Sequence, residues 1–133
     1  MLIPLIKRAL EFHPGNIIFS EGDSGTAAFI VQQGYVEVLK GGMHIAVLGT
    51  GEIFGEMSGI TGEPRSATVR AKTHVRVMRL DARTNYEFLN LVSQRPELAK
   101  KVIEQLAQRL RKTTTALVEE AHSRHAPMLP IHP

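Results

Sequence analysis

Glycine-rich separators divide residues 12–80 into short runs of β-branched residues, and this pattern limits the fold more than any other sequence feature. The runs predict strands near 17–20, 27–33, 35–40, 43–48, 66–72 and 74–80. The separators are Gly22-Asp23-Ser24-Gly25, Gly34, Gly41-Gly42 and Gly49-Thr50-Gly51, where glycine can adopt a positive φ. Because no long helix lies between these strands, they predict an antiparallel sandwich or barrel, and we expect a β jelly roll.

The hydrophobic period changes at both ends of this region. The apolar segment before Pro14 and Gly15 is expected to be a short N-terminal helix within residues 1–11. After Leu80, the sequence Thr84-Asn85-Tyr86-Glu87 matches a capping box and predicts a helix through about Gln94. A second, long helix begins near Pro96, which suits a first helical turn because it lacks an N–H group.

These elements predict one domain over residues 1–125, with the jelly roll at 12–80 and the C-terminal helices at 81–125. The tail over 126–133 holds three prolines and is expected to be disordered. No helix-turn-helix follows the long helix, so we expect no DNA binding by this chain through such a motif.

The long helix carries an apolar seam at alternating steps of four and three residues: Ala99, Ile103, Leu106, Leu110, Thr113 and Leu117. Such a seam packs either on the sheet or against a partner helix. A helix of about thirty residues is about 45 Å long, which exceeds what a small sandwich can cover. We therefore expect a homodimer formed through this helix.

Composition excludes several classes of protein. The 133 residues include no cysteine, which rules out disulfides, thiolate catalysis and cysteine-ligated metals and fits a cytoplasmic protein. No apolar run approaches the roughly 18 residues of a membrane span. The formal net charge of +3 favours anionic partners. Lysine and arginine gather only in the last third, where interleaved Glu97 and Glu104 favour a solvated helix face over a nucleic-acid surface.

Residues 51–69 fit neither a strand nor a long helix. The segment begins with glycine, allows one helical turn after Gly55, turns again at Gly62 to Pro64 and enters a strand near Ser66. A short helix here would point free backbone amides at one spot, and Arg65 could place its planar guanidinium at the same spot. This combination predicts a phosphate site.

The same segment resembles the phosphate-binding cassette of the cyclic nucleotide-binding domain family, which includes catabolite activator proteins, regulatory subunits of cyclic-AMP-dependent kinase and cyclic nucleotide-gated channels. The cassette reads Phe54-Gly55-Glu56, then eight residues, then Arg65-Ser66-Ala67-Thr68-Val69. Upstream positions that also fit the family are Phe12, Pro14, Gly15, Ile18, Phe19, Glu21-Gly22-Asp23, Phe29, Ile30, Gly34, Val36 and Val38. The resemblance covers about residues 1–125.

The resemblance implies a role for each cassette residue. Arg65 would pair with the cyclic phosphate, and the Ser66 hydroxyl with the Ser66 and Ala67 amides would complete the anion cradle. Glu56 would accept the ribose 2′-hydroxyl proton. Gly55 would let the sugar approach the backbone, and Met57 lies in the turn behind the cradle. The alternative for Arg65 and Glu56 is a surface ion pair that shapes the loop.

In the catabolite activator subgroup, the resemblance further implies that the long helix covers the base. Thr113 and Thr114 match a polar pair that contacts the adenine amino group, one residue from each subunit, and Arg109 would stack on the base. Two hydroxyls can accept from the adenine amine, which guanine lacks at that position. Cyclic AMP is therefore the expected ligand, with cyclic GMP as the alternative, and Thr113 could instead simply pack in the seam.

One position departs from the family pattern. Gly59 stands inside the short phosphate helix where the family usually has leucine. Glycine costs a helix about 1 kcal/mol and removes an apolar contact to the moving helices. We expect ligand binding to survive this change, whereas coupling to a partner domain is placed in doubt.

Three functions can be compared against these residues: a ligand sensor, a metalloenzyme and a dimerisation scaffold. A ligand sensor that does no chemistry and needs no cofactor is favoured. A cupin-like metalloenzyme would also use a jelly roll, but none of the six histidines forms a His-x-His pair. A dimerisation scaffold with a non-functional pocket is supported only by Gly59, and the intact Glu56, Arg65 and Ser66 speak against it.

Overall fold

The computed structural model describes residues 7–124 as eight strands and three helices. The strands are β1 (Lys7–Phe12), β2 (Ile17–Phe19), β3 (Ala28–Gln33), β4 (Val36–Lys40), β5 (Met43–Leu48), β6 (Ile53–Phe54), β7 (Thr68–Ala71) and β8 (Val75–Leu80). The helices are α1 (Glu56–Thr61), α2 (Asn85–Ser93) and α3 (Pro96–Arg124).

The strands form two four-stranded antiparallel sheets, in the orders β1-β8-β3-β6 and β2-β7-β4-β5. Side chains from both sheets meet in one apolar core, with Phe29 and Val77 from the first sheet and Val36 and Val69 from the second. The alternating burial expected of such strands places these residues inward. This arrangement confirms the predicted antiparallel jelly roll and all six predicted strands.

The predicted N-terminal helix is wrong from Lys7 onward. Residues 7–12 form β1, which pairs with β8 from Lys7↔Leu80 to Phe12↔Val75. Leu10 and Phe12, two residues apart, pack against the core, so the segment has the period of a strand. Residues 1–6 of that prediction, and the tail over 126–133, lie outside the described residues.

The short strand β6 was not expected, because it lies in the segment that fitted neither a strand nor a long helix. Its two residues pair with Phe29 and Ile30 of β3 and are almost completely buried. Two residues are too few to show a hydrophobic period, so no sequence pattern could have found this strand.

The predicted cap of α2 is present in part. Thr84 is the N-cap residue, and its hydroxyl oxygen accepts a hydrogen bond from the Glu87 amide at 3.1 Å. The Glu87 carboxylate accepts from the Arg83 amide at 3.1 Å, one residue before the partner that a capping box uses.

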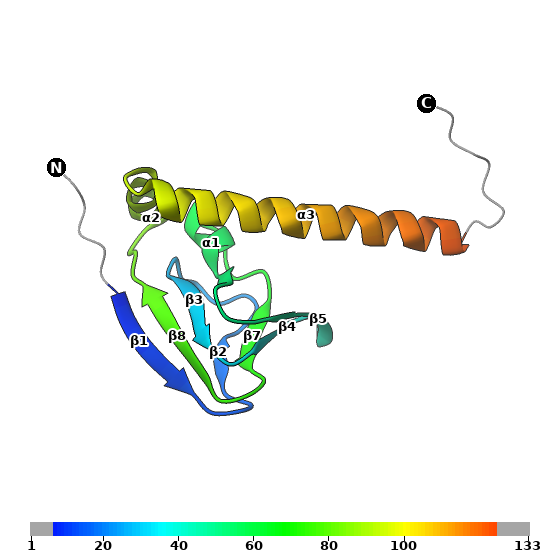
Figure 1. Cartoon of the computed structure of the whole chain (residues 1–133), viewed down its shortest axis with the longest axis horizontal. Helices are drawn as coiled ribbons and strands as arrows, with labels where there is room; N and C mark the ends of the chain where they lie inside the picture. Colours follow the sequence, from blue (N-terminus) through cyan, green and yellow to red (C-terminus); the bar gives the residue numbers. More distant parts are fainter. Residues whose placement is uncertain (1–6, 125–133) are drawn as a thin grey trace.

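Helices α2 and α3 cover the outer face of the first sheet with a second apolar cluster, which includes Ala28, Ile53, Leu80, Phe88 and Val102. Figure 1 shows α3 crossing the top of the jelly roll, with its C-terminal half extending beyond the strands. Ile103, Leu110 and Leu117 on this helix are 65%, 68% and 60% exposed. The sheets therefore leave these three seam positions uncovered.

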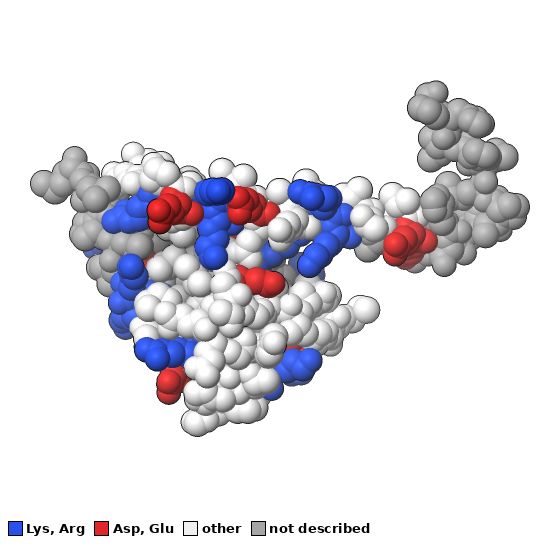
Figure 2. All heavy atoms as spheres, in the orientation of Figure 1, with Lys and Arg blue, Asp and Glu red and all other residues white. Residues whose placement is uncertain are grey.

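Charges of both signs alternate along α3, as Figure 2 shows for one face of the molecule. Lys100 and Glu104 form one ion pair on this helix, at 3.8 Å. This mixture is typical of a solvated helix surface. Within residues 7–124, no helix combines the length and the apolar character that a membrane span requires.

Candidate functional site

The site is built around Gly55, which joins β6 to α1. Its φ of 81° places it in the left-handed region, where glycine pays no steric penalty. A Cβ at this position would lie 2.9 Å from Arg65 Nη1 and 3.0 Å from the Ala27 carbonyl oxygen. Glycine is therefore required both by the turn and by the close approach of Arg65.

Arg65 is buried beside this turn, with 5% of its surface exposed. Its Nη1 donates to the Gly55 carbonyl and its Nη2 to the Ala27 carbonyl, each at 2.8 Å. The guanidinium carbon lies 4.2 Å from the centre of the Phe19 ring, within cation–π range. Burial lowers the pKa of Arg65, but a guanidinium titrates so high that it stays charged. The cation is thus fixed in place by three contacts.

Glu56, the first residue of α1, is also buried and is only 1% exposed. Its Oε1 accepts from Arg109, whereas its Oε2 has no hydrogen-bond partner among the described residues. Burial raises the pKa of Glu56, and the Arg109 charge opposes that rise. A buried carboxylate oxygen without a donor is costly, so this atom is suited to accept a proton donor from a ligand.

Arg109 connects α3 to Glu56 and to Ile53, the first residue of β6. Its guanidinium contacts both the Glu56 carboxylate and the Ile53 carbonyl. One turn earlier on the helix, Gln105 Oε1 accepts from the Ile53 amide at 2.6 Å. The backbone of Ile53 is therefore held by α3 on both its donor and its acceptor side.

These residues surround a cavity of about 80 Å³, which we call the cradle. Its walls are Phe19, Gly55, Glu56, Met57, Ser58, Arg65, Ser66, Ala67, Val69 and Arg109. Seven of the nine predicted site residues are among them: Gly55, Glu56, Met57, Arg65, Ser66, Ala67 and Arg109. The two charged cassette residues thus share one hollow, and the burial of both side chains contradicts a surface ion pair.

The other two predicted residues, Thr113 and Thr114, lie outside the cradle on an exposed part of α3. Their hydroxyls donate to the carbonyls of Arg109 and Leu110, each at 2.9 Å. Their contact with a base, and the stacking of Arg109 on it, stay predictions.

Sequence reasoning did not assign a binding role to Phe19 or Val69. Phe19 was identified only as a core position, and its contact with the Arg65 cation depends on how β2 lies beside the cradle. Val69 ends the Arg65-to-Val69 string, and alternation along β7 would have placed it inward.

A larger cavity, of about 520 Å³, lies between the first sheet and α3. It is lined by Lys7, Ile30, Gln32, Met78, Leu80, Arg95, Glu97, Leu98 and Lys101. None of its charged side chains is buried, so it lacks the fixed charges that distinguish the cradle. Among residues 7–124, no group of three or more histidine or acidic side chains is placed to hold a metal ion.

The sequence model of the family described as "Cyclic nucleotide-binding domain" matches residues 9–92. This chain belongs to the cyclic nucleotide-binding domain family. The matched range contains the whole cassette and the strands β2 and β7, which contribute Phe19 and Val69 to the cradle. It ends inside α2.

Relatives of this cyclic nucleotide-binding domain include the channel "Cyclic nucleotide-gated potassium channel RHE_CH03180" of Rhizobium etli. It is 40% identical over 88 residues, which are 66% of this chain and 24% of the channel. The chain therefore spans about a quarter of that relative's length. Among solved structures, the catabolite activator protein of Thermus thermophilus matches 88% of this chain and 55% of its own, with a TM-score of 0.69 and 31% identity.

A third match is the EAL enzyme Bd1971 in its cAMP-bound form, with a TM-score of 0.58 and 34% identity. The match covers 86% of this chain and 32% of that one. The same enzyme also matches in a cGMP-bound form. The matched proteins are thus a channel, a catabolite activator protein and an EAL enzyme, so the output of this domain has to be argued from its own residues.

Proposed function

We propose that this domain is a regulatory module that binds cyclic AMP in preference to cyclic GMP and leaves it chemically unchanged. The observation that carries the proposal is the pairing, in one cavity, of the fixed Arg65 cation with the orphaned Oε2 atom of Glu56. An anion and a hydroxyl donor a few ångströms apart satisfy both groups. A ribose 3′,5′-cyclic phosphate offers this combination.

The phosphate end of the ligand meets the positive side of the cradle. Arg65 keeps its two carbonyl contacts and uses its remaining N–H groups for a phosphate oxygen, since a guanidinium has five. Ser66 and Ala67 line the same wall and supply a hydroxyl and two amides. Such charge-assisted bonds are about twice as strong as neutral ones.

The ribose end of the ligand can affect α3, because Glu56, which would bind the ribose, also contacts Arg109 of that helix. A ligand hydroxyl that donates to Glu56 changes the strength of the Glu56–Arg109 contact, because one carboxylate then serves two donors. Arg109 and Gln105 both hold Ile53, so any shift of Arg109 is felt along α3. We expect the ligand to change the position of α3 through these differential contacts.

A second copy of this chain is the partner that α3 fits best. Ile103, Leu110 and Leu117 are spaced by seven residues and are exposed, as a coiled-coil seam requires. The seam continues over the part of α3 that extends beyond the strands (Figure 1). Burying it against another copy removes these side chains from water.

The preference for adenine rests on the hydroxyl of Thr113. Its hydrogen is directed to the Arg109 carbonyl, so its oxygen is left as an acceptor. The 6-amino group of adenine can donate to this oxygen, whereas the 6-oxo group of guanine cannot. Family membership alone does not decide the base, because the EAL enzyme matches in both cAMP-bound and cGMP-bound forms.

The first experiment compares cyclic AMP, cyclic GMP and cyclic di-GMP by thermal shift at one salt concentration. A ligand that binds the folded domain raises the melting temperature with its concentration. We expect the largest shift with cyclic AMP and the smallest with cyclic di-GMP. If none of the three shifts the melting temperature, the domain is a dimerisation scaffold without a ligand.

Calorimetric titration of Glu56→Gln then tests whether the unpartnered Glu56 carboxylate oxygen binds the ribose hydroxyl. The variant should lose more affinity for cyclic AMP than for 2′-deoxy-cyclic AMP, because only the former donates its 2′-hydroxyl. Glu63→Gln, an exposed change in the loop after α1, is the matched control for the lost charge. Equal losses for both nucleotides would remove Glu56 from the ribose contact.

A further inference from the structure

A second cavity, of about 350 Å³, lies beside Arg65, and we call it the arginine pocket. Its walls are Ile18, Phe19, Asp23, Ser24, Gly25, Thr26, Ala27, Phe29, Arg65, Arg79, Ala82 and Arg83. Of the two cavities only the cradle includes Glu56 and Ser66, and only the arginine pocket includes Arg79 and Arg83. Arg65 lines both.

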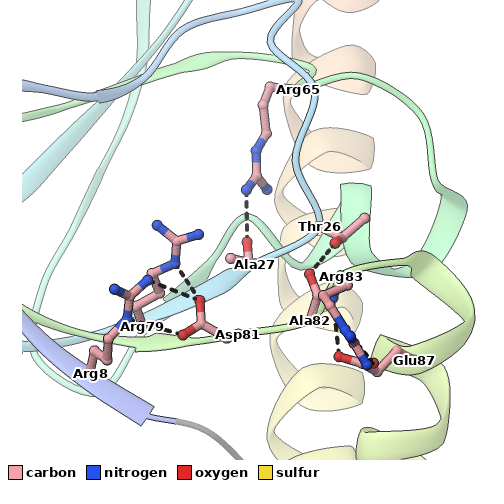
Figure 3. A network of polar contacts seen from close by, with 9 residues as sticks. All are labelled: Arg8, Thr26, Ala27, Arg65, Arg79, Asp81, Ala82, Arg83 and Glu87. Carbon is pink, nitrogen blue, oxygen red and sulfur yellow. Dashed lines mark hydrogen bonds and ion pairs between the residues drawn. The ribbon is translucent and has the colours of Figure 1, made fainter.

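Figure 3 shows how the three arginines approach. Arg65 reaches in from one side, while Arg79 and Arg83 come from the opposite side, near the end of β8 and the start of α2. Gly25 leaves room behind Arg65, since a Cβ there would lie 3.2 Å from Arg65 Nη2. The pocket therefore places three cations from three separate segments around one hollow.

Arg79 is only partly neutralised. Its Nε donates to Asp81 at 2.7 Å, but Asp81 also accepts from Arg8 at 3.1 Å, so two guanidiniums share one carboxylate. Within residues 7–124, the two terminal nitrogens of Arg79 have no hydrogen-bond partner. These nitrogens are charged donors that a ligand in the pocket could use.

The remaining charges do not fill this gap. Arg83 pairs with Glu87 at 3.3 Å on the exposed side. Asp23 is the only acidic residue among the pocket walls, and its carboxylate accepts from the Ser20 amide at 2.9 Å. Burial is the main cause that lowers the pKa of Arg65; the positive charge of Arg79 lowers it further, while the charges of Asp23 and Glu56 act in the opposite direction. Two like charges that face one hollow are stabilised by an anion between them.

We propose that the arginine pocket binds a small phosphate anion of the pyrophosphate type, held by Arg79, Arg65 and, at the rim, Arg83. Phosphate geometry matches the planar fork of arginine, and a pocket of this volume is large enough for two linked phosphate groups. The arginine pocket and the cradle have only Phe19 and Arg65 in common, and neither of these is acidic.

Sharing Arg65 has a consequence for the cradle, and this part rests on the proposed function. An anion in the arginine pocket neutralises part of the Arg65 charge, so it weakens the attraction for a cyclic phosphate on the other side. Pyrophosphate should therefore act as an antagonist of cyclic nucleotide binding without occupying the cradle.

Calorimetric titration with pyrophosphate alone, in magnesium-free buffer at constant ionic strength, tests the site itself. Arg79→Gln should weaken binding about tenfold, the loss expected for a charge-assisted contact. Arg76→Gln lies on the same strand outside the pocket and removes the same charge, so it should change affinity less than about twofold. Because Arg79→Gln also removes a contact to Asp81, Arg83→Gln provides a second variant at the exposed rim, with an expected loss of about threefold.

Three results would overturn the site. These are no pyrophosphate binding by the wild type, equal losses in the Arg79 and Arg76 variants, and full binding in Arg79→Gln, which would place the anion in the cradle. None of them bears on cyclic nucleotide binding, because no nucleotide is present.

A second titration, of cyclic AMP with and without pyrophosphate, tests the antagonism. At a pyrophosphate concentration about three times the wild-type dissociation constant, pyrophosphate should weaken cyclic AMP binding severalfold in the wild type and in Arg76→Gln, but much less in Arg79→Gln. An equal effect in Arg79→Gln would show direct competition in the cradle and contradict the shared-arginine mechanism. If cyclic AMP does not bind at all, the proposed function fails while the pyrophosphate site stands on its own titration.

Discussion

The ring of Phe88 lies directly against Gly59: a Cβ at residue 59 would fall 2.7 Å from the ring atoms Cγ and Cδ1. Gly59 belongs to α1 beside the cradle, and Phe88 belongs to α2, so this contact joins the site to the C-terminal helices. Both residues are buried. Glycine at position 59 was expected to remove an apolar contact between α1 and the C-terminal helices. The contact is nevertheless present, because the Phe88 side chain of α2 fills the space beside Gly59.

Gly59→Ala should destabilise the domain. The added methyl group collides with a ring that is itself only 2% exposed and cannot swing into solvent. Overpacking costs about 1–3 kcal/mol, and alanine returns about 1 kcal/mol of helix propensity. The expected net loss is therefore up to about 2 kcal/mol, measured by urea unfolding.

Phe88→Leu supplies the control for this interpretation, because leucine vacates the ring's position. The double variant Gly59→Ala with Phe88→Leu should be more stable than the sum of the two single losses predicts. Additive losses would mean that the two residues do not compete for the same space.

Much of the fold follows from local sequence because each strand carries its own period. The glycine separators and the runs of β-branched residues define six strands without reference to one another. β1 escaped because Pro14 and Gly15 mark only its end, and its alternation involves just Leu10 and Phe12. Its identity as a strand comes from pairing with β8, nearly seventy residues away, which no local pattern encodes.

The cassette was predictable for a different reason. Its residues are close in sequence, so the spacing from Gly55 to Ala67 already places Glu56 and Arg65 in one short segment. The partners that hold them, namely the Ala27 carbonyl, the Phe19 ring and Arg109, come from three distant elements. Their contacts depend on tertiary packing. The orphaned Glu56 oxygen could likewise be seen only once its burial was known.

Arg109→Leu should destabilise the domain by leaving the buried Glu56 carboxylate without its ion-pair partner. Removing one member of a buried ion pair costs about 3–5 kcal/mol, but Arg109 is partly exposed, so we expect about 1–3 kcal/mol. Urea unfolding measures the loss, and Arg111→Leu on the exposed side of the same helix is the control. Adding Glu56→Gln should recover much of the loss, and no recovery would contradict an electrostatic cause.

Affinity for cyclic AMP should fall on acidification at a higher pH than an ordinary glutamate would give. Burial raises the pKa of Glu56 above its usual 4.5, so protonation begins earlier as the pH falls. The ribose hydroxyl donates to the ionised carboxylate, and the protonated acid is the poorer acceptor. Ligand binding therefore releases a proton below the raised pKa, and affinity decreases there.

Titrations between pH 8 and pH 5 by calorimetry would show this dependence. The 2′-deoxy analogue is the control, because it shares the adenine and the phosphate but lacks the hydroxyl. Its affinity should change less over the same range. Parallel curves for the two nucleotides would assign the pH dependence to another group.

Leu110→Glu should prevent self-association through α3. The residue is 68% exposed in one chain and lies at the middle of the Ile103–Leu110–Leu117 seam, where a buried charge would face its symmetry mate. Analytical ultracentrifugation should show a dimer for the wild type and a monomer for the variant. Gln108→Glu adds the same charge off the seam and should leave the dimer intact. A monomeric wild type, or a dimer that survives Leu110→Glu, would exclude this interface.

Thr113→Val should narrow the preference for cyclic AMP over cyclic GMP. The hydroxyl donates to the Arg109 carbonyl at 2.9 Å and so presents only an acceptor to the base, which adenine satisfies and guanine does not. Valine keeps the shape and removes the acceptor, so the ratio of the two affinities should fall about five- to tenfold, the effect of one hydrogen bond. Thr115→Val is the matched control. Two residues further along the helix, its hydroxyl donates in the same way to the carbonyl four residues earlier, that of Arg111, at 3.0 Å. An unchanged ratio in Thr113→Val would assign Thr113 to the seam alone, and a similar drop in both variants would trace the effect to the helix rather than to the base.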